Sequence, residues 1–126
     1  MKEVVHTDNA PAAVGPYSQA VKIGNLLFTA GQIPLDPETM KVVEGDVTAQ
    51  TEQVMKNMEA VLTAAGTNFD NVIKSTVFLQ DMGDFGAMNA VYGRFAGENP
   101  PARSAVQVAA LPLGVLVEIE MIASLE

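Results

Sequence analysis

The segment between residues 47 and 65 has the 3.6-residue period of an amphipathic α-helix. Apolar or small side chains recur there at spacings of four and three, which predicts one buried helical face made of Val47, Thr51, Val54, Met58, Val61 and Ala65. Asp46 or Thr48 is expected to cap its first turn, and Gly66 to end it in a left-handed conformation. Such a helix must pack its apolar face on a second layer of structure.

The segments that flank this helix have the period of two that is typical of strands. A Gly24-Asn25 dipeptide between two apolar runs predicts a tight hairpin. Residues 84–96 are expected to form a second, shorter helix with Asp84 as its cap. Loops are expected at 11–16 and 34–46, which are rich in proline and glycine. The expected strands are 3–6, 20–23, 26–30, 70–80, 102–108 and 115–123.

This order of elements predicts an α+β fold, with one mixed sheet and two helices packed on one of its faces. A length of 126 residues suits a single domain over residues 1–126. In the strand at 70–80, one face carries Ile73, Ser75, Val77 and Leu79, and the other carries Val72, Lys74, Thr76 and Phe78. Because both faces hold apolar groups and no further helix is available, we expect another subunit to cover the second face.

The charge of the chain narrows its possible partners. Fifteen acidic and seven basic residues give a net charge of −8, and Arg94 and Arg103 are the only arginines. Nucleic acids and anionic membrane surfaces are therefore not expected as partners. No cysteine and one histidine, His6, exclude disulfides, thiolate catalysis and a multi-histidine metal site. No targeting or membrane-spanning segment is visible, so a soluble, cytoplasmic protein is expected. No phosphate loop, dinucleotide fingerprint or zinc signature is present, and no metal or organic cofactor is expected.

Arg103 and Glu118 are the strongest candidates for chemistry. Arg103 opens a strand directly after a double proline, and its planar guanidinium can hold a carboxylate through two hydrogen bonds. Glu118 and Glu120 point to one face of the last strand, roughly 6.5–7 Å apart. One of them could activate water if a pocket desolvates it. The ordinary alternatives are a surface arginine paired with an acid and a solvent-facing strand edge.

Three further residues are candidates for ligand contacts. Tyr17 follows Gly15-Pro16 on a rigid loop, Gly31 ends a strand with a bare backbone N–H, and Asn89 lies on the second helix. Each also has an ordinary interpretation, as a half-buried tyrosine, a strand end and an exposed helical residue. The residues alone therefore predict a soluble, oligomeric α+β domain that binds a small carboxylate.

Several motifs together resemble the RidA (YjgF) family of reactive imine deaminases over essentially the whole chain. The matching segments are residues 9–20 (NAPAAVGPYSQA), 29–34 (TAGQIP), 49–51 (AQT), 57–58 (NM), 74–78 (KSTVF), 101–104 (PARS), 111–112 (LP) and 118–120 (EIE). The resemblance implies a chorismate-mutase-like fold that assembles as a homotrimer, with the sheets forming a central barrel and the sites lying between subunits.

The same resemblance implies an activity and roles for individual residues. The reaction is hydrolysis of 2-imino acids, the tautomers of 2-aminoacrylate and 2-aminocrotonate, to 2-oxo acids and ammonia. Arg103 matches the arginine that holds the substrate carboxylate, and Glu118 the glutamate that activates water. Tyr17 and Asn89 match residues that line the cleft, and the backbone at Gly31 and Ala105 would complete its polar contacts.

Two positions depart from the pattern of several relatives, which have cysteine at 105 and serine at 30, whereas this chain has Ala105 and Ala30. A cysteine nucleophile is thus excluded, which favours direct attack by water.

The alternative function is a regulatory or chaperone-like trimer that binds a metabolite without turnover. A ribonuclease or translation inhibitor is disfavoured by the charge of −8.

Overall fold

The computed structural model describes all residues from Met1 to Glu126 and contains one six-stranded mixed sheet. The strands lie in the order β1-β2-β3-β6-β4-β5, and every neighbouring pair is antiparallel except β4 and β5. They are β1 (Glu3–Val5), β2 (Ala20–Ile23), β3 (Leu26–Thr29), β4 (Val72–Leu79), β5 (Ala102–Gln107) and β6 (Val117–Ser124). The long helices are α1 (Val47–Ala65) and α2 (Phe85–Ala96). Single 3₁₀ turns span Phe69–Asn71, Met82–Asp84 and Pro112–Gly114.

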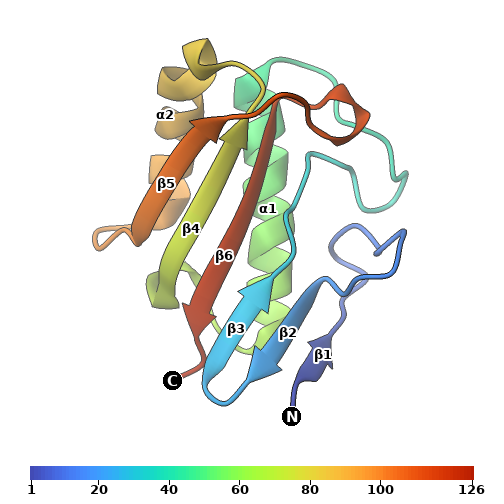
Figure 1. Cartoon of the computed structure of the whole chain (residues 1–126), viewed down its shortest axis with the longest axis vertical. Coiled ribbons are helices and arrows are strands. Elements are labelled where there is room, and N and C mark those ends of the chain that lie inside the picture. The colour runs from blue at the N-terminus through green and yellow to red at the C-terminus, as the bar shows by residue number, and fades with distance from the viewer.

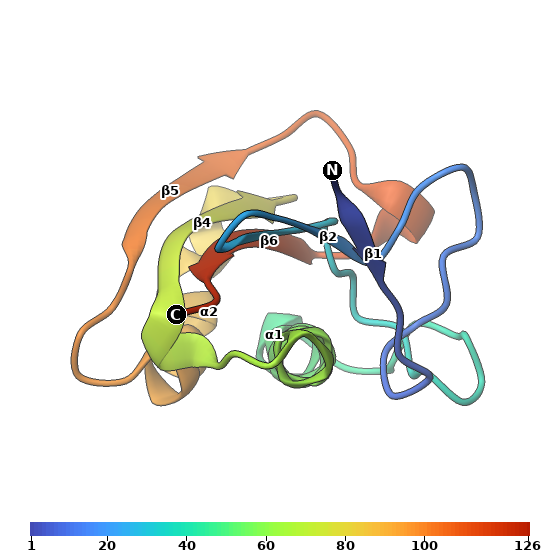
Figure 2. The ribbon, with the colours of Figure 1, turned by 90° about the horizontal axis from the view of Figure 1, so that it is seen from below.

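Both helices lie on the same side of the sheet, as the view along it makes plain (Figures 1 and 2). The predicted apolar face of α1 is buried throughout, from Val47 to Ala65. It packs on the side chains that alternate along β6, where Val117, Ile119 and Met121 are buried. The expected α+β architecture, with two helices covering one face of a mixed sheet, is confirmed. Neither helix is both long and apolar enough to cross a bilayer.

The ends of α1 follow local signals. The Asp46 carboxylate accepts a hydrogen bond from the Ala49 N–H at 3.1 Å, and Gly66 has a φ of 86°. At α2 the expected cap is wrong in part. Asp84 occupies the capping position, but its side chain makes no capping bond, because a 3₁₀ turn leads directly into this helix and its backbone is already helical there.

At the start of β4 the side chains do not alternate strictly between the two faces of the sheet. A register shift against β6 between Val72 and Lys74 places Val72 in the core and leaves Ile73 half exposed, the reverse of the expected pattern. Beyond this bulge Ser75, Val77 and Leu79 are buried as expected. The glutamate-bearing strand β6 lies between β3 and β4, so the alternative of a solvent-facing edge is wrong for it.

The face of the sheet opposite the helices carries no covering layer within the chain (Figure 2). Cross-strand partners share a face, so the paired residues Val4, Val21, Phe28 and Ile122 form one apolar row across four strands. A second row contains Glu118, Phe78 and Val106. We call this surface the open face. Its apolar content is what led us to expect a second subunit there.

Candidate functional site

Glu118 lies on the open face of β6, directly against Gly31. Two backbone hydrogen bonds, Gln32 N–H to the Ile119 carbonyl at 2.8 Å and Ile119 N–H to the Gln32 carbonyl at 3.1 Å, fix residues 31–32 beside that strand. A Cβ atom at position 31 would overlap the Glu118 carboxylate and come within 2.8 Å of its Cδ. The glycine thus leaves the space that the glutamate side chain occupies.

The surroundings of Glu118 favour its neutral form. Burial raises the pKa of this carboxyl above its ordinary value of 4.5, and the nearby charge of Glu120 raises the same pKa further. The chain contains two ion pairs, His6–Asp8 and Lys56–Glu52, and neither provides a cation to Glu118. A half-buried carboxylate with a raised pKa and no cationic partner is suited to accept a proton.

A cleft of about 550 Å³ opens over Glu118 and Gly31. Tyr17 lies at its side, half exposed, with its hydroxyl oxygen accepting a weak hydrogen bond of 3.4 Å from the Val14 N–H. Most of the remaining wall is apolar and comes from Pro11, Val14, Ile33, Leu35, Pro112 and Leu113. The structure therefore brings three of the predicted residues, Tyr17, Gly31 and Glu118, to one cleft.

Two buried amides hold the loops that form this cleft, and neither was among the residues predicted for the site. The Gln19 side chain donates to the carbonyls of Thr7 and Pro11 at 3.0 and 2.9 Å and accepts from the Thr7 N–H at 2.7 Å. Asn57 on α1 donates to the carbonyls of Leu35 and Ile33 at 2.9 and 3.2 Å. The only signal in the sequence was an amide side chain directly before an apolar residue, Ala20 or Met58.

Arg103 lies on β5 and points to the helix side of the sheet. Its Nη1 donates to the Asn89 side-chain oxygen at 2.7 Å. Its guanidinium carbon lies 4.8 Å from the centre of the Tyr92 ring and 5.5 Å from that of Phe85, in cation–π contact with both. Tyr92 is itself held by a 2.6 Å hydrogen bond with Ser75 in the core. The guanidinium is therefore oriented without any carboxylate partner.

The hollow beside Arg103 measures about 390 Å³ and is also lined by Asn89, Tyr92 and Pro101. Ala105 follows two residues later on the same face of β5, half-buried and paired with Val77. The structure thus unites Asn89 with Arg103. It does not unite them with Glu118, because Arg103 points to the helix side of the sheet and Glu118 to the open face.

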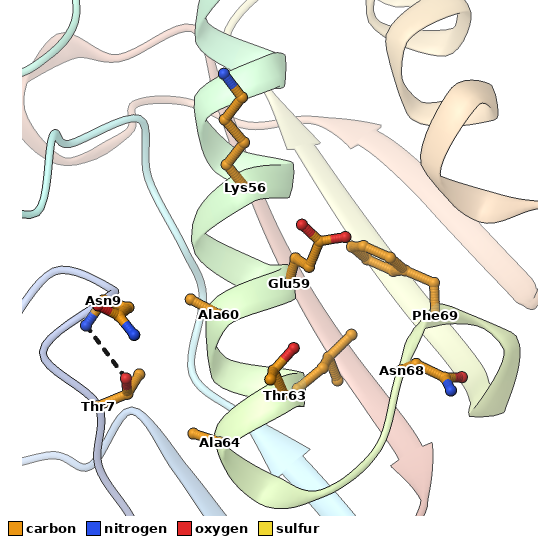
Figure 3. A pocket seen from close by; sticks show the side chains of 10 residues that line it. Thr7, Asn9, Lys56, Glu59, Ala60, Thr63, Ala64, Asn68 and Phe69 are labelled. Carbon is orange, nitrogen blue, oxygen red and sulfur yellow. Dashed lines mark hydrogen bonds between the residues drawn. The ribbon is translucent and has the colours of Figure 1, made fainter.

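A third hollow, of about 360 Å³, lies on the outer surface of α1 and contains none of the predicted residues (Figure 3). Lys56, Glu59 and Thr63 of the helix lie between the N-terminal segment at Thr7 and the 3₁₀ turn at Phe69. Its charged groups are exposed, and Lys56 pairs with Glu52 along the helix at 3.6 Å. No three His, Cys, Asp or Glu side chains lie close enough together to hold a metal ion.

Comparison with known proteins identifies the family. Residues 7–125 match the profile of the family described as Endoribonuclease L-PSP. The chain belongs to the Rid family. It is 52% identical over 124 residues to Reactive Intermediate Deaminase A, chloroplastic, of Arabidopsis thaliana. The match covers 98% of this chain and 66% of that protein.

Solved structures of Rid proteins have the same fold as this chain. The crystal structure of RidA from the Antarctic bacterium Psychrobacter sp. matches with a TM-score of 0.93 at 51% identity, covering 97% of this chain and 98% of that one. The crystal structure of E. coli TdcF with bound serine matches with a TM-score of 0.92 at 42% identity, with the same coverage. The resemblance stated from the sequence motifs is confirmed, and the YjgF-like fold with it.

Proposed function

We propose that this chain hydrolyses 2-imino acids, including the tautomers of 2-aminoacrylate and 2-aminocrotonate, to 2-oxo acids and ammonia. The observation that carries the proposal is the Glu118 carboxylate, desolvated against a residue that has no side chain, with a raised pKa and no cationic partner. Family membership and the relative named a reactive intermediate deaminase support it. The net charge of −8 favours a small anion over a nucleic acid as the ligand.

In the proposed reaction one water adds across the C=N bond. Glu118 takes a proton from the water as the water oxygen bonds to the imine carbon and the C=N π bond breaks, and this proton passes from Glu118 to the nitrogen. The resulting carbinolamine gives its hydroxyl proton to Glu118 as the C=O bond forms and the C–N bond breaks, and the same proton passes to the departing nitrogen, which leaves as ammonia. Because an imine carbon is already electrophilic, orienting the substrate and placing one water are sufficient, and no metal or organic cofactor takes part.

Arg103 is proposed to hold the substrate carboxylate through its planar guanidinium. Asn89 fixes the orientation of that group, and Tyr17 with the backbone at Gly31 and Ala105 completes the polar contacts. That the TdcF crystal structure contains bound serine, itself a small amino acid with a carboxylate, supports a ligand of this kind.

The proposal requires more than one copy of the chain. Arg103 and Glu118 point from opposite faces of one sheet, so a complete site needs the arginine of one subunit and the glutamate of another. We propose a homotrimer in which the open faces meet as a central barrel and a site lies at each boundary between subunits. This assembly would also cover the apolar row at Phe28 and Ile122 on the open face.

A coupled assay with mixed subunits tests the chemistry and the arrangement together. A threonine dehydratase generates 2-aminocrotonate in situ, and formation of 2-oxobutanoate is followed with and without the protein. Arg103→Ala and Glu118→Gln should each abolish most of the acceleration when present alone. When the two variants are co-expressed in equal amounts, about a quarter of the sites should regain both intact residues and activity should return to that extent.

The outcomes separate the hypotheses. No recovery in the mixture, with both variants folded and assembled, would show that the two residues do not share an intersubunit site. A wild-type protein that binds 2-oxobutanoate but accelerates nothing would favour the alternative, a metabolite-binding protein without turnover. Normal turnover by Arg103→Ala would remove that residue from the site.

A further inference from the structure

Three side chains on one face of α2 contact the Arg103 guanidinium. Phe85, Asn89 and Tyr92 follow one another at spacings of four and three residues, which aligns them along one side of the helix. The guanidinium carbon lies 4.8 Å from the centre of the Tyr92 ring and 5.5 Å from that of Phe85, and Nη1 donates to the Asn89 oxygen at 2.7 Å. This is the only hydrogen bond that the guanidinium makes within the chain, so the donors on Nε and Nη2 can serve a ligand.

The hydrogen bond to Asn89 fixes one point of the guanidinium but not its plane. A single donor–acceptor pair permits the planar group to turn about the line that joins the two atoms, and Asn89 is exposed on the surface of α2. A carboxylate held through two parallel hydrogen bonds must lie in the plane of the guanidinium. The orientation of that plane therefore decides where such a carboxylate can bind.

The Tyr92 ring supplies a second constraint. Its face attracts a cation because the π electrons are the negative end of the ring quadrupole, and the attraction strengthens where water is excluded. The side chain of Tyr92 is buried at 4% exposure, whereas Arg103 is half-buried. Tyr92 can therefore act on a ligand only through Arg103, and it lies closer to the guanidinium than Phe85 does.

The core of the protein holds this ring in place. The hydroxyl groups of Tyr92 and Ser75 share a hydrogen bond of 2.6 Å, and Ser75 is completely buried. Ser75 is also the residue that pairs with Arg103 between β4 and β5, so the two side chains leave the sheet next to each other on its helix side. Tyr92 bridges these neighbours, with its hydroxyl on Ser75 and its ring on Arg103. Phenylalanine lacks the hydroxyl for the first contact, and leucine lacks the π face for the second.

We infer that Tyr92 is a positioning residue, whose ring, anchored by Ser75, holds the guanidinium plane of Arg103 in place for the substrate carboxylate. The inference rests on the proposed function, because it takes Arg103 as the group that binds this carboxylate. The carboxylate keeps its charge throughout the proposed reaction, so a loosened guanidinium should weaken the binding of substrate and transition state alike. Loss of the ring should therefore raise KM more than it lowers kcat, by about ten-fold for a partly buried cation–π contact.

Two substitutions of Tyr92 and one control test this role. Tyr92→Leu removes the ring and should raise KM for an imine generated in situ by an amino acid oxidase, and Kd for 2-oxobutanoate by calorimetry, about ten-fold. Tyr92→Phe keeps the ring and should change both by less than about three-fold. Phe95→Leu is the matched control, because the ring of Phe95 packs on Phe69 at 5.8 Å and not on Arg103. It should leave KM and Kd at their wild-type values, even where it lowers Tm.

A variant that keeps the shape of the ring separates electrostatics from packing, and it keeps the test valid if Tyr92→Leu does not fold. Trifluorophenylalanine in place of Tyr92 fills nearly the same space as phenylalanine. Its fluorine atoms withdraw electron density and remove most of the attraction of the ring face for a cation. KM and Kd should therefore exceed those of Tyr92→Phe several-fold in proteins of equal secondary structure, a difference that a packing role would not produce.

The position of the guanidinium can also be measured without a ligand. Because the chain has two arginines, a nuclear magnetic resonance spectrum of the guanidinium Nε–H groups contains two signals. The exposed Arg94 makes no cation–π contact and is the reference for a mobile side chain. Ring currents should displace the Arg103 signal from that reference. Tyr92→Leu should remove most of this displacement, and Tyr92→Phe should retain it.

Three results would overturn the inference. One is a folded Tyr92→Leu protein with wild-type KM and Kd. Another is an equal rise of both constants in Tyr92→Leu and Phe95→Leu, which would indicate a general loosening of α2. The third is equal values for Tyr92→Phe and its fluorinated analogue.

The same measurements distinguish a failure of the proposed function. If the wild-type protein binds 2-oxobutanoate but hydrolyses no imine, the proposed function fails, while Kd and the Arg103 signal still decide the role of Tyr92. If the wild-type protein binds no 2-oxobutanoate and hydrolyses no imine, both proposals fail.

Discussion

Replacing Gly31 by alanine should disable the proposed chemistry while leaving the fold in place. The added Cβ would lie 2.8 Å from the carboxyl carbon of Glu118, whereas ordinary contacts begin at 3.4 Å. That carbon must therefore move by about 0.6 Å, and the nearer oxygen by more. Since a displacement of about 1 Å in a reacting group costs about a hundred-fold in rate, we expect kcat to fall by that order.

The fold should tolerate the change because Gly31 has no positive φ, so alanine can adopt its backbone conformation. We expect a Tm within about 5 °C of wild type by calorimetry. Gly86→Ala is the matched control, since an added Cβ there meets nothing within 4 Å. It should stabilise α2 by about 0.5–1 kcal/mol and leave kcat unchanged.

A double-mutant cycle isolates the cause. In a Glu118→Ala background, Gly31→Ala should have almost no further effect on the residual rate, because no carboxylate remains to be displaced. A wild-type kcat for Gly31→Ala alone, or an equal loss in both backgrounds, would refute the reasoning that the position of this carboxylate determines the rate.

The pKa of Glu118 is raised in the folded protein, so its carboxyl binds a proton more tightly there than in the unfolded chain. The stability that this adds is fully present below the ordinary pKa of 4.5, and it is lost as the pH rises through the pKa of the folded protein. Glu118→Gln should therefore unfold at a higher temperature than wild type at pH 7, with the difference closing below about pH 4.5; an unchanged difference would contradict this. Glu120→Gln removes one cause of the raised pKa, so the acidic limb of the kcat/KM profile should move to lower pH, not stay fixed. Gln19→Leu should lower the free energy of unfolding by about 2 kcal/mol in urea titrations, because it leaves buried loop groups of Thr7 and Pro11 unpaired, whereas the exposed Gln80→Leu should not.

The elements most accurately predicted from sequence were those with local causes. Helix α1 begins and ends where Asp46 and Gly66 predict, because a capping carboxylate and a left-handed glycine act within one turn. The inverted facing of Val72 and Ile73 was not predictable, since the bulge depends on how β4 pairs with β6. The central position of β6 likewise depends on contacts with strands far away in the chain.

In the candidate site, too, features with local causes were predictable and features that depend on distant contacts were not. Residue type was enough to make Arg103 and Glu118 candidates beside ordinary alternatives, and their proposed roles came from the resemblance to the Rid family. That the two side chains point to opposite faces of the sheet can be known only from the register of β4 against its neighbours β5 and β6. The roles of Gln19 and Asn57 required knowledge of which loop carbonyls reach them, and the sequence pattern contains no such information.

If the proposed site is formed between subunits, a sheet that presents its arginine on one face and its glutamate on the other makes catalysis depend on protein concentration. Under the proposed chemistry a newly synthesised chain is inert until it meets other copies, and it becomes inert again on dilution. The concentration at which specific activity falls to half then reports the strength of the assembly. The reactive intermediate would thus be removed fastest in cells that maintain a high level of this protein.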